Sequence, residues 1–223
     1  MKLIKKIFYF FVREFKISFK NLNDLFSNVL FFFLAIFVFV FAIGPDKQAL
    51  NTFGIGIIWS LLLLSSTLSL RRFFQDDFNN DALIVIHMGG LSYELIVILK
   101  IISHFVFVKL PFLIAIPIAS TLVHIDYNKI ILLLISFIIG SLILSCLGSI
   151  SAAMNLLNKR NFALGSLIVM IFSIPMIIFS VAVVNDEENF SSLINILIGL
   201  FLIFFAISPW VSAACIRLAL SNK

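Results

Sequence analysis

The stretch Leu25–Pro45 reads LFSNVLFFFLAIFVFVFAIGP and contains no charged residue. A run of this length crosses the hydrocarbon layer of a membrane, about 30 Å thick, as one helix. Further charge-free runs follow along the chain: Gln48–Leu70, Leu110–Ile125, Ile130–Asn158, Asn161–Asn185 and Asn189–Ile216. The run Leu110–Ile125 is short, but an apolar stretch from Leu95 precedes it, so we expect one span from about Leu95 to Val123. The sequence therefore predicts six transmembrane helices.

The composition places the whole chain in a membrane. Of its 223 residues, 62% are hydrophobic and 12% are charged, and the mean hydropathy is +1.18. A soluble domain has about 45–50% apolar and about 25% charged residues, and one globular core cannot bury the difference. Cys146 and Cys215 each lie alone in an apolar stretch, without the spacing of a metal or redox motif. We expect an all-α integral membrane protein without a soluble domain.

Lysine and arginine are concentrated on one side of the expected spans. That side holds Lys2, Lys5, Lys6, Arg13, Lys16, Lys20, Arg71, Arg72, Lys159, Arg160, Arg217 and Lys223, and the other holds Lys47 and Lys129. The positive-inside rule then predicts that both termini are cytoplasmic. The net charge of +5 reflects this topology and does not indicate binding of nucleic acid. We expect a bacterial inner membrane, and a mitochondrial inner membrane stays open as an alternative.

Residues 1–24 form a segment of a different kind. Polar side chains recur every three or four positions, at Lys2, Lys5, Tyr9, Arg13, Lys16 and Lys20, and apolar residues fill the rest. This pattern is typical of an amphipathic helix that lies in the membrane interface. A signal peptide is the rival interpretation, but its n-region would not be a long amphipathic helix. We therefore divide the chain into an elbow helix, 1–24, and a permease domain, 25–223.

No catalytic or nucleotide-binding motif occurs in the sequence. It lacks the phosphate-loop pattern G-x-x-x-x-G-K-[ST], H-E-x-x-H and G-x-S-x-G, and no pair of carboxylates lies within a span. This argues against an ion-coupled pump or an intramembrane enzyme. His87, His104 and His124 are well separated, and we interpret them as surface or boundary residues; Lys100 and His104 lie one helical turn apart at the membrane boundary. We predict no catalytic, cofactor-binding or metal-binding residue.

The longest connection is the cytoplasmic loop Arg71–Glu94. Its acidic and amide residues are spaced i,i+4, whereas its phenylalanines share the opposite side, and Gly89-Gly90 ends the pattern. One interpretation is a solvated loop that becomes helical at the membrane. The other is an amphipathic helix that fits a groove on a cytoplasmic ATPase. The residues predicted for this ATPase-coupling interface are Arg72, Phe73, Phe74, Asp76, Asp77, Phe78, Asp81 and Leu83.

The stretch from Phe74 to Ile86 reads FQDDFNNDALIVI. It resembles the loop pattern F-x-x-D-x-x-D-G-x-L-E-x-L of the CcmB family, also called heme exporter protein B, the permease subunits of cytochrome c maturation ABC transporters. Phe74, Asp77 and Leu83 fit this pattern, and it is altered at Asn80, Asp81, Ile84 and Ile86. Other short matches follow in order: Gly44-Pro45, Gly56–Trp59, Leu63–Ser66, Arg72, Lys100 with His104, Leu110-Pro111, Ile174-Pro175, Ile178-Phe179, Ser208-Pro209, Ala213-Ala214 and Arg217.

The resemblance implies an ABC-2 type permease that works as paired copies with two ATPase subunits. The expected partners are the ATPase CcmA, the membrane proteins CcmC and CcmD, and indirectly the heme chaperone CcmE. Such a complex uses ATP to export heme or to release the heme-loaded chaperone. Heme is thus expected as a handled species and not as a cofactor of this chain, which lacks the tryptophan-rich motif of CcmC. We interpret Trp59 and Trp210 as interfacial anchors.

Four prolines lie inside the expected spans: Pro111, Pro117, Pro175 and Pro209. Each removes a backbone hydrogen bond and permits a kink, so we predict bending there, with ordinary packing kinks as the alternative. Two other functions stay open. One is an ABC-2 permease that exports a lipid, polysaccharide or drug, and the other is a membrane scaffold that transports nothing.

Overall fold

The computed structural model describes residues 2–69, 73–157 and 163–223, and these residues form helices without a β-strand. In chain order the elements are α1 (Lys2–Lys20), α2 (Leu22–Ile43), α3 (Lys47–Ser69), α4 (Gln75–Asn79), α5 (Ala82–Met88), α6 (Tyr93–His104), the π-helical segment η2 (Phe105–Lys109), α7 (Phe112–Leu122), α8 (Tyr127–Leu157), α9 (Ala163–Asn185) and α10 (Phe190–Ser221).

Within the described ranges, five helices are long and apolar enough to cross a membrane: α2, α3, α8, α9 and α10. Each overlaps one of the charge-free runs along most of its length. An apolar run forms a helix in a membrane because a helix satisfies its own backbone hydrogen bonds inside hydrocarbon. α5 and the segment Tyr93–Lys109 are bent by 120° relative to each other. If this bent pair is counted as one span, the total is six. The chain is therefore a multi-pass, all-α membrane protein, as the composition predicts.

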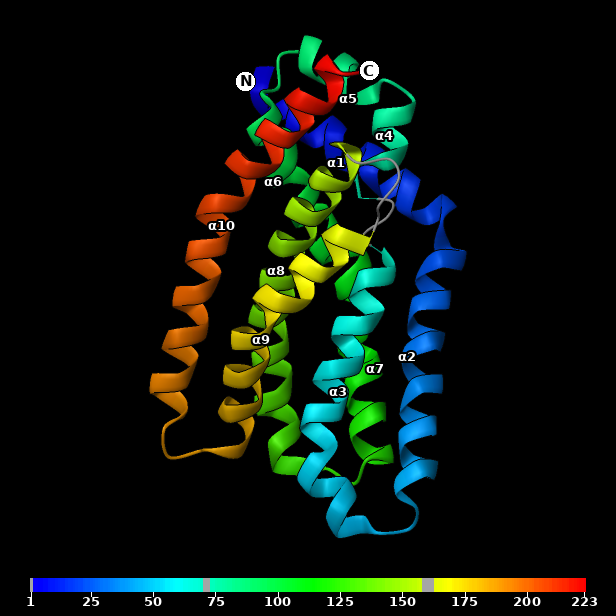
Figure 1. Ribbon diagram of the computed structural model, residues 1–223, viewed down its shortest axis with the longest axis vertical. Coiled ribbons are helices and arrows are strands. Elements are labelled where there is room, and N and C mark those ends of the chain that lie inside the picture. The colour runs from blue at the N-terminus through cyan, green and yellow to red at the C-terminus, as the bar shows by residue number, and fades with distance from the viewer. Residues whose placement is uncertain (1, 70–72, 158–162) are drawn as a thin grey trace.

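The expected span from Leu95 to Val123 is built from three pieces. α6 passes into η2, the chain turns at Leu110 and Pro111, and α7 then runs for 11 residues. Proline suits this place because its missing N–H falls at a helix start, where no helical partner is needed. π-Helical segments inside helices often mark functional sites. This span is therefore discontinuous, with α6 near the chain termini and α7 in the body of the bundle (Figure 1).

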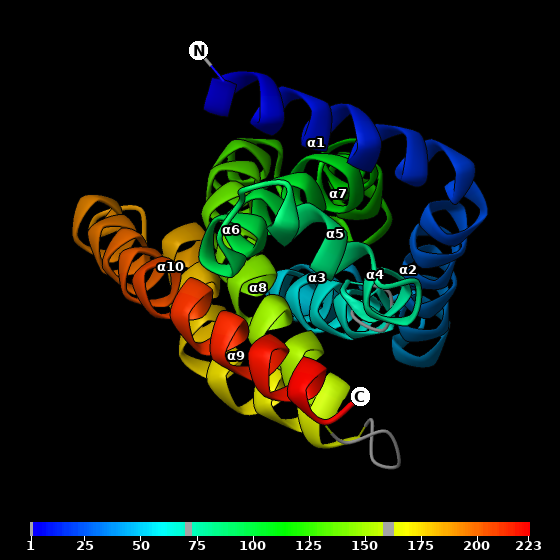
Figure 2. The same cartoon turned by 90° about the horizontal axis from the view of Figure 1, so that it is seen from above.

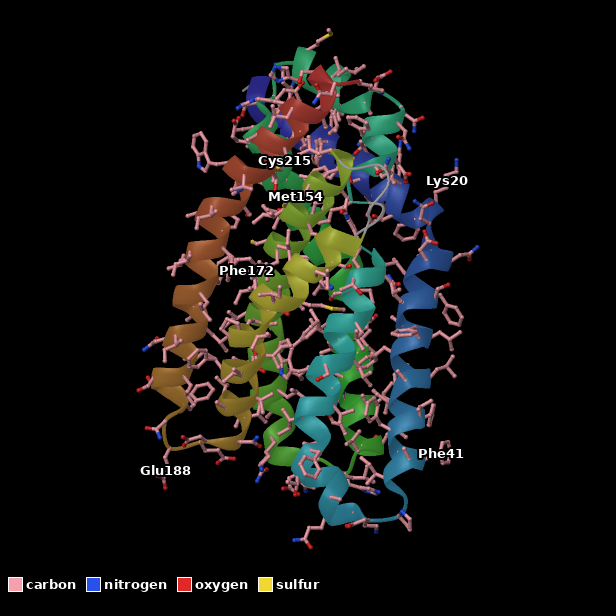
Figure 3. The ribbon with its side chains drawn as sticks, in the orientation of Figure 1. Lys20, Phe41, Met154, Phe172, Glu188 and Cys215 are labelled. Atoms are coloured by element: carbon pink, nitrogen blue, oxygen red, sulfur yellow. The ribbon has the colours of Figure 1, made fainter. Side chains whose placement is uncertain are left out.

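α8 lies at the centre of the bundle and packs against α9 and α10, with further contacts to α3, α6 and α7 (Figure 1, and from above in Figure 2). Both termini lie at one end, together with α4 and α5. The turns between α2 and α3, α7 and α8, and α9 and α10 lie at the other end. Lys20 and Glu188 mark these two ends in Figure 3. Charges predicted for opposite sides of the membrane are thus separated along the long axis.

Trp59 of α3 lies in the core of the bundle and not at a membrane interface. Its side chain is buried, and its ring centroid is 6.3 Å from that of Phe137 on α8. A Cβ atom built on Gly140 of α8 would lie 2.4 Å from Trp59 Cη2, so the glycine makes room for the indole. The interpretation of Trp59 as an interfacial anchor is therefore wrong. Trp210 of α10 is exposed on the outside of the bundle.

α1 lies across the end of the bundle that holds the termini, at a steep angle to the long helices (Figure 2). It exposes one apolar stripe, made of Ile4, Phe8, Phe15 and Phe19. Such a stripe suits a helix lying in a membrane interface. Another face of α1 is turned inward and packs on α6, with Phe10 and Glu14 buried. The pattern of basic and apolar residues in the sequence did not indicate this inward face.

The four prolines occupy two kinds of position. Pro117, Pro175 and Pro209 lie inside α7, α9 and α10, as expected. Pro111 instead lies just before α7, between two helical segments. Pro111 is therefore associated with a break in the helix, whereas bending at the other three stays a prediction.

Candidate functional site

The loop predicted to contact an ATPase forms α4 and α5 at the end of the bundle that holds both termini (Figure 1). Its predicted apolar contact residues are buried within this chain: Phe73, Phe74, Phe78 and Leu83. Phe74 is 0% exposed, and all four belong to one apolar cluster with residues of α1, α6, α8 and α10. The loop thus covers its apolar face with its own bundle, and a coupling role of these side chains stays a prediction. Arg72 lies outside the described residues.

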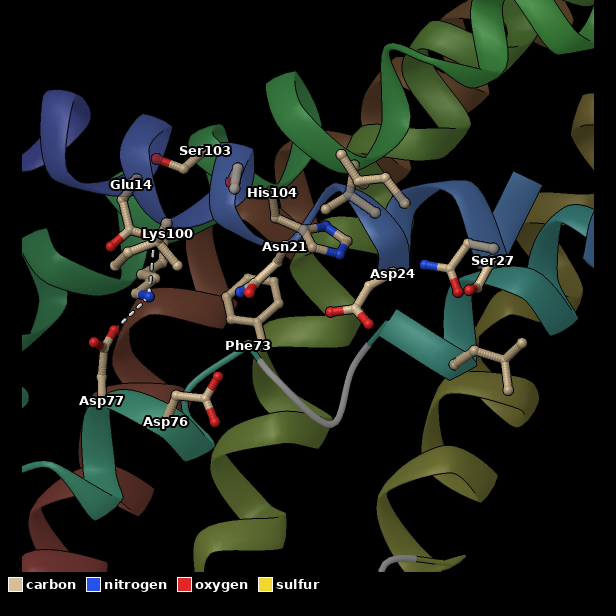
Figure 4. A pocket seen from close by; sticks show the side chains of 16 residues that line it. Glu14, Asn21, Asp24, Ser27, Phe73, Asp76, Asp77, Lys100, Ser103 and His104 are labelled. Carbon is tan, nitrogen blue, oxygen red and sulfur yellow. Dashed lines mark hydrogen bonds and ion pairs between the residues drawn. The ribbon is translucent and has the colours of Figure 1, made fainter. Parts of the chain in front are cut away.

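Charged side chains from α1, α4 and α6 meet in a buried cluster. The Lys100 ammonium donates to Glu14 Oε2 at 3.0 Å and also pairs with Asp77 (Figure 4). Arg13 Nη1 donates to Glu14 Oε1 at 2.7 Å, and the same guanidinium pairs with Asp77. Two cations thus balance two carboxylates, which offsets the cost of burying each charge. We define these residues, Arg13, Glu14, Asp77 and Lys100, as the charge cluster.

The charge cluster favours the ionised forms of Asp77 and Arg13. Burial alone would raise the pKa of Asp77, which is 5% exposed, but the Lys100 ammonium and the Arg13 guanidinium outweigh it and hold the pKa below its ordinary 3.8. For Arg13, burial lowers the pKa, but hydrogen bonding and charge from Asp77 and Glu14 raise it above its ordinary value. The ionised states therefore stabilise one another across three helices.

Two basic residues, Arg217 of α10 and Lys223 just after it, form ion pairs with residues of the segment from α4 to α6. Lys223 Nζ donates to the Phe78 carbonyl oxygen at 2.8 Å, lies 5.0 Å from the centroid of the Phe78 ring, and pairs with Asp81. Arg217 of α10 pairs with Glu94 of α6. α4 is therefore connected to α1, α6 and the end of α10 at once.

The exposed remainder of α4 and α5 lies at the end of the bundle that holds the termini (Figure 1). Asp76 and Asp81 are exposed, as expected for the polar side of this loop. Val85 and Met88 are 67% and 81% exposed and lie three residues apart, on one face of α5. Exposed apolar residues grouped in this way are suited to contact with another protein. We define Val85 and Met88 as the α5 tip.

Lys100 and His104, predicted to lie at the membrane boundary, are one turn apart on α6 and are both buried. His104 Nδ1 lies 3.0 Å from Ser145 Oγ of α8, and the His104 ring centroid is 4.8 Å from that of Phe73. Both residues line a cavity of about 320 Å³ that is also bounded by α1, α2 and α4 (Figure 4). The two side chains therefore belong to the floor of a cavity at the end of the bundle.

The three histidines are held apart. His87 stacks on Tyr93 with ring centroids 4.1 Å apart, His104 contacts α8, and His124 lies in the turn that follows α7. In residues 2–69, 73–157 and 163–223, no group of three or more His, Cys, Asp or Glu side chains is arranged to hold a metal ion. The described part of the chain thus offers no such donor set.

The partners of Asp77 and Asp81 were missed from the sequence. Arg13 was assigned to a basic membrane-facing surface, Glu14 was given no role, and Lys223 was counted only for topology. One signal was present: Glu14 is the first acidic residue of the chain and stands among six basic ones in residues 1–20. An isolated carboxylate in a basic amphipathic helix indicates a specific partner on the inward face.

The chain matches the family described as CcmB protein over residues 5–219. It belongs to the CcmB family. It is similar to heme exporter protein B of Haemophilus influenzae, at 29% identity over 94% of this chain and 96% of that protein. The corresponding figures are 30%, 92% and 94% for heme exporter protein B of Bradyrhizobium diazoefficiens, and 29%, 93% and 96% for that of Escherichia coli K12.

The fold explains how this CcmB chain matches its family's loop pattern. The positions that fit the pattern, Phe74, Asp77 and Leu83, are all buried. The positions that depart from it are exposed or partly exposed: Asn80, Asp81, Ile84 and Ile86. The matching residues therefore pack the loop onto the bundle, and the differing residues lie where packing constrains them less.

Proposed function

We propose that this chain is the permease subunit of an ABC transporter for cytochrome c maturation, driven by ATP hydrolysis in a separate subunit. The match to the CcmB family over residues 5–219 carries the proposal. The relatives are named heme exporter protein B, which supports heme, or a heme-loaded chaperone, as the handled species. The sequence contains no phosphate-loop motif, so ATP hydrolysis is assigned to the partner.

The proposed location is a bacterial inner membrane, with both termini, α4 and α5 in the cytoplasm. The positive-inside rule supports this orientation, since basic residues of α1 and the C-terminus lie at the same end as α5. The opposite end carries Asp46, Asp126 and Asp186 in its turns. An ATPase would therefore approach the end that holds the charge cluster and the α5 tip.

The α5 tip is the proposed docking point for the ATPase subunit CcmA. Movement at the tip would reach α1 and α6 through Asp77 and reach α10 through Lys223. α5 is in contact with α4, and α4 is tied to α1, α6 and the end of α10. Movement of α5 would therefore be transmitted to these three helices. In this proposal the α5 tip makes the contact with the ATPase, and the buried phenylalanines of the loop transmit the movement from inside the bundle.

The membrane faces of the bundle are proposed for the other partners. α2 and α10 carry many exposed apolar residues, among them Phe41, which points away from the bundle in Figure 3. These faces suit contact with lipid, with CcmC and CcmD, or with a second copy of this chain. CcmE would be engaged only through the assembled complex. We assign heme to the complex and no cofactor to this chain.

The test is a double variant of the α5 tip, Val85→Glu with Met88→Glu, in cells that carry the complete maturation system. We expect loss of ATPase co-purification, loss of cytochrome c maturation, and heme retained on the chaperone. Tyr127→Glu, at an exposed position at the other end of the bundle, is the matched control. Unchanged co-purification and maturation in the double variant would contradict the proposal. A scaffold role is indicated instead if an inactive ATPase causes no defect while deletion of this chain does.

A further inference from the structure

An apolar groove lies at the corner where α1 passes into α2, and it faces the η2–α7 segment. Its volume is about 380 Å³, and its lining includes Phe19, Leu22, Val106, Phe107, Leu110 and Ile114. Ile114 of α7 is 74% exposed, so the groove is open to the outside of the bundle. α1 lies across the end of the bundle and α7 lies in its body (Figure 1). The groove therefore lies where the interfacial helix meets the bundle, and its lining suits a hydrocarbon chain.

Aromatic contacts hold α1 against η2 beside this groove. The ring centroid of Phe15 is 5.6 Å from that of Phe107 on η2 and 4.6 Å from that of Phe19 on α1. Phe19 and Phe107 both line the groove. Phe15 thus connects the two aromatic lining residues, and the shape of the groove is set by packed side chains.

Two lysines of α1, Lys16 and Lys20, lie at the rim of the groove. Both are exposed, and their i,i+4 spacing places them on one face of the helix. Lys20 stands between the lining residues Phe19 and Leu22 in the chain, at the α1–α2 corner labelled in Figure 3. Neither lysine forms an ion pair with a residue of the ranges 2–69, 73–157 and 163–223. Like charges at this spacing repel each other, so an anion bound by both would relieve the repulsion.

The acidic residue of α1 is already engaged elsewhere. Glu14 is 7% exposed and pairs with Arg13 and Lys100 in the charge cluster. The exposed face of α1 is therefore cationic, and basic residues on an interfacial helix attract anionic lipid headgroups. A cationic rim beside an apolar groove matches the two parts of an anionic phospholipid.

We propose that the groove holds an acyl chain of an anionic glycerophospholipid while Lys16 and Lys20 bind its phosphate group. Phosphate oxygens accept hydrogen bonds from lysine ammonium groups, and the opposite charges strengthen these bonds. Phosphatidylcholine and phosphatidylethanolamine carry a cation in their own headgroup, which competes with the lysines for the phosphate. Phosphatidylglycerol carries no such cation and suits the site better. An occupied groove would brace the α1–α2 corner against η2 and α7.

The headgroup is tested by native mass spectrometry of the purified full-length chain, titrated in detergent with palmitoyl-oleoyl phosphatidylglycerol, phosphatidylethanolamine or phosphatidylcholine. We expect preferential retention of phosphatidylglycerol. Lys16→Gln with Lys20→Gln should lower that preference by about fivefold, the effect of two exposed charge contacts. Lys47→Gln with Lys129→Gln removes two positive charges at the opposite end of the bundle and should leave the preference unchanged. Equal retention of the three lipids, or equal effects of the two double variants, overturns the proposal.

The acyl chain is tested by changing the groove. Ile114→Ser should reduce retention of phosphatidylglycerol, because it places a hydroxyl in the apolar lining. Ile171→Ser, at an exposed position on α9, is the matched control and should leave retention unchanged. If the two serine variants behave alike, the lipid does not lie in the groove and the proposal fails.

The source of the anion is tested by competition. Glycerol 3-phosphate has the phosphate without a chain, and oleate has a chain with a carboxylate; neither should displace phosphatidylglycerol at the same concentration. Displacement by glycerol 3-phosphate would mean that the lysines take a soluble phosphate, and displacement by oleate would mean that the groove takes a fatty acid. Either result overturns phospholipid binding. These readouts need no ATPase, so they are independent of the proposed transporter function.

Discussion

Lys100 of α6 and Asp77 of α4 form a buried ion pair, and the same ammonium donates to Glu14 of α1 at 3.0 Å. The three residues are far apart in the sequence, yet they join α1, α4 and α6 at one point. Because the pair is buried, its loss costs more than the loss of a surface pair. The position of α4 therefore depends on charges contributed by the bundle itself.

Removing the charge of Asp77 should destabilise the fold. Asp77→Asn leaves Lys100 and Arg13 with one carboxylate between them in a buried site, and we expect a loss of about 3–5 kcal/mol in the free energy of unfolding. Thermal unfolding of the purified chain in detergent measures this. Asp76→Asn, one position away and exposed, should change stability by less than about 0.5 kcal/mol. Equal effects of the two substitutions would contradict a structural role for the charge cluster.

The contribution of Asp77 should be lost only in acid. Its pKa in the folded chain is held below the ordinary 3.8, so the folded state favours the ionised form. The stabilisation is therefore complete above the unfolded pKa and disappears as the pH falls through the lowered folded value. We expect the difference in Tm between the natural chain and Asp77→Asn to stay constant from about pH 8 to about pH 5 and to shrink below 3.8. A difference that already shrinks near pH 6 would point to another group.

Space beside Trp59 should limit substitution at Gly140. Gly140→Ala places a Cβ 2.4 Å from Cη2 of the indole, and such overpacking costs about 1–3 kcal/mol. Gly199→Ala of α10 meets no atom within 4 Å and should be neutral or stabilising by up to about 1 kcal/mol. Adding Trp59→Phe to Gly140→Ala removes the crowding and should recover part of the loss. An additive double variant in an unfolding assay would disprove the contact.

Lys223 should restrain α4 without adding much stability. Its pairs with Asp81 and the Phe78 carbonyl are partly exposed, so Lys223→Ala should change the free energy of unfolding by less than about 1 kcal/mol. Hydrogen exchange of residues 75–88 should nevertheless become faster, because one of the three attachments of α4 is lost. Lys129→Ala, at the opposite end, is the control. Unchanged exchange in Lys223→Ala would show that α1 and α6 suffice.

The candidate site was only partly predictable. The loop Arg71–Glu94 was correctly placed as an amphipathic helical element, because its i,i+4 spacing is a local property of a helix. Its orientation could not be decided from this spacing. The same pattern describes a helix whose phenylalanines face a partner and one whose phenylalanines face its own bundle, and Phe74 takes the second arrangement. Local spacing carries no information about which apolar surface lies nearest.

The sequence by itself determined where the chain crosses the membrane and which ends carry the positive charge. Both depend on local sums, the length of apolar runs and the placement of lysine and arginine, that need no knowledge of neighbouring helices. Only the tertiary structure decided that Trp59 faces Gly140 and that Asp77 meets Lys100, Arg13 and, through them, Glu14. Such pairs depend on the packing of whole helices, and residues separated by dozens of positions are brought together by geometry that no local pattern encodes.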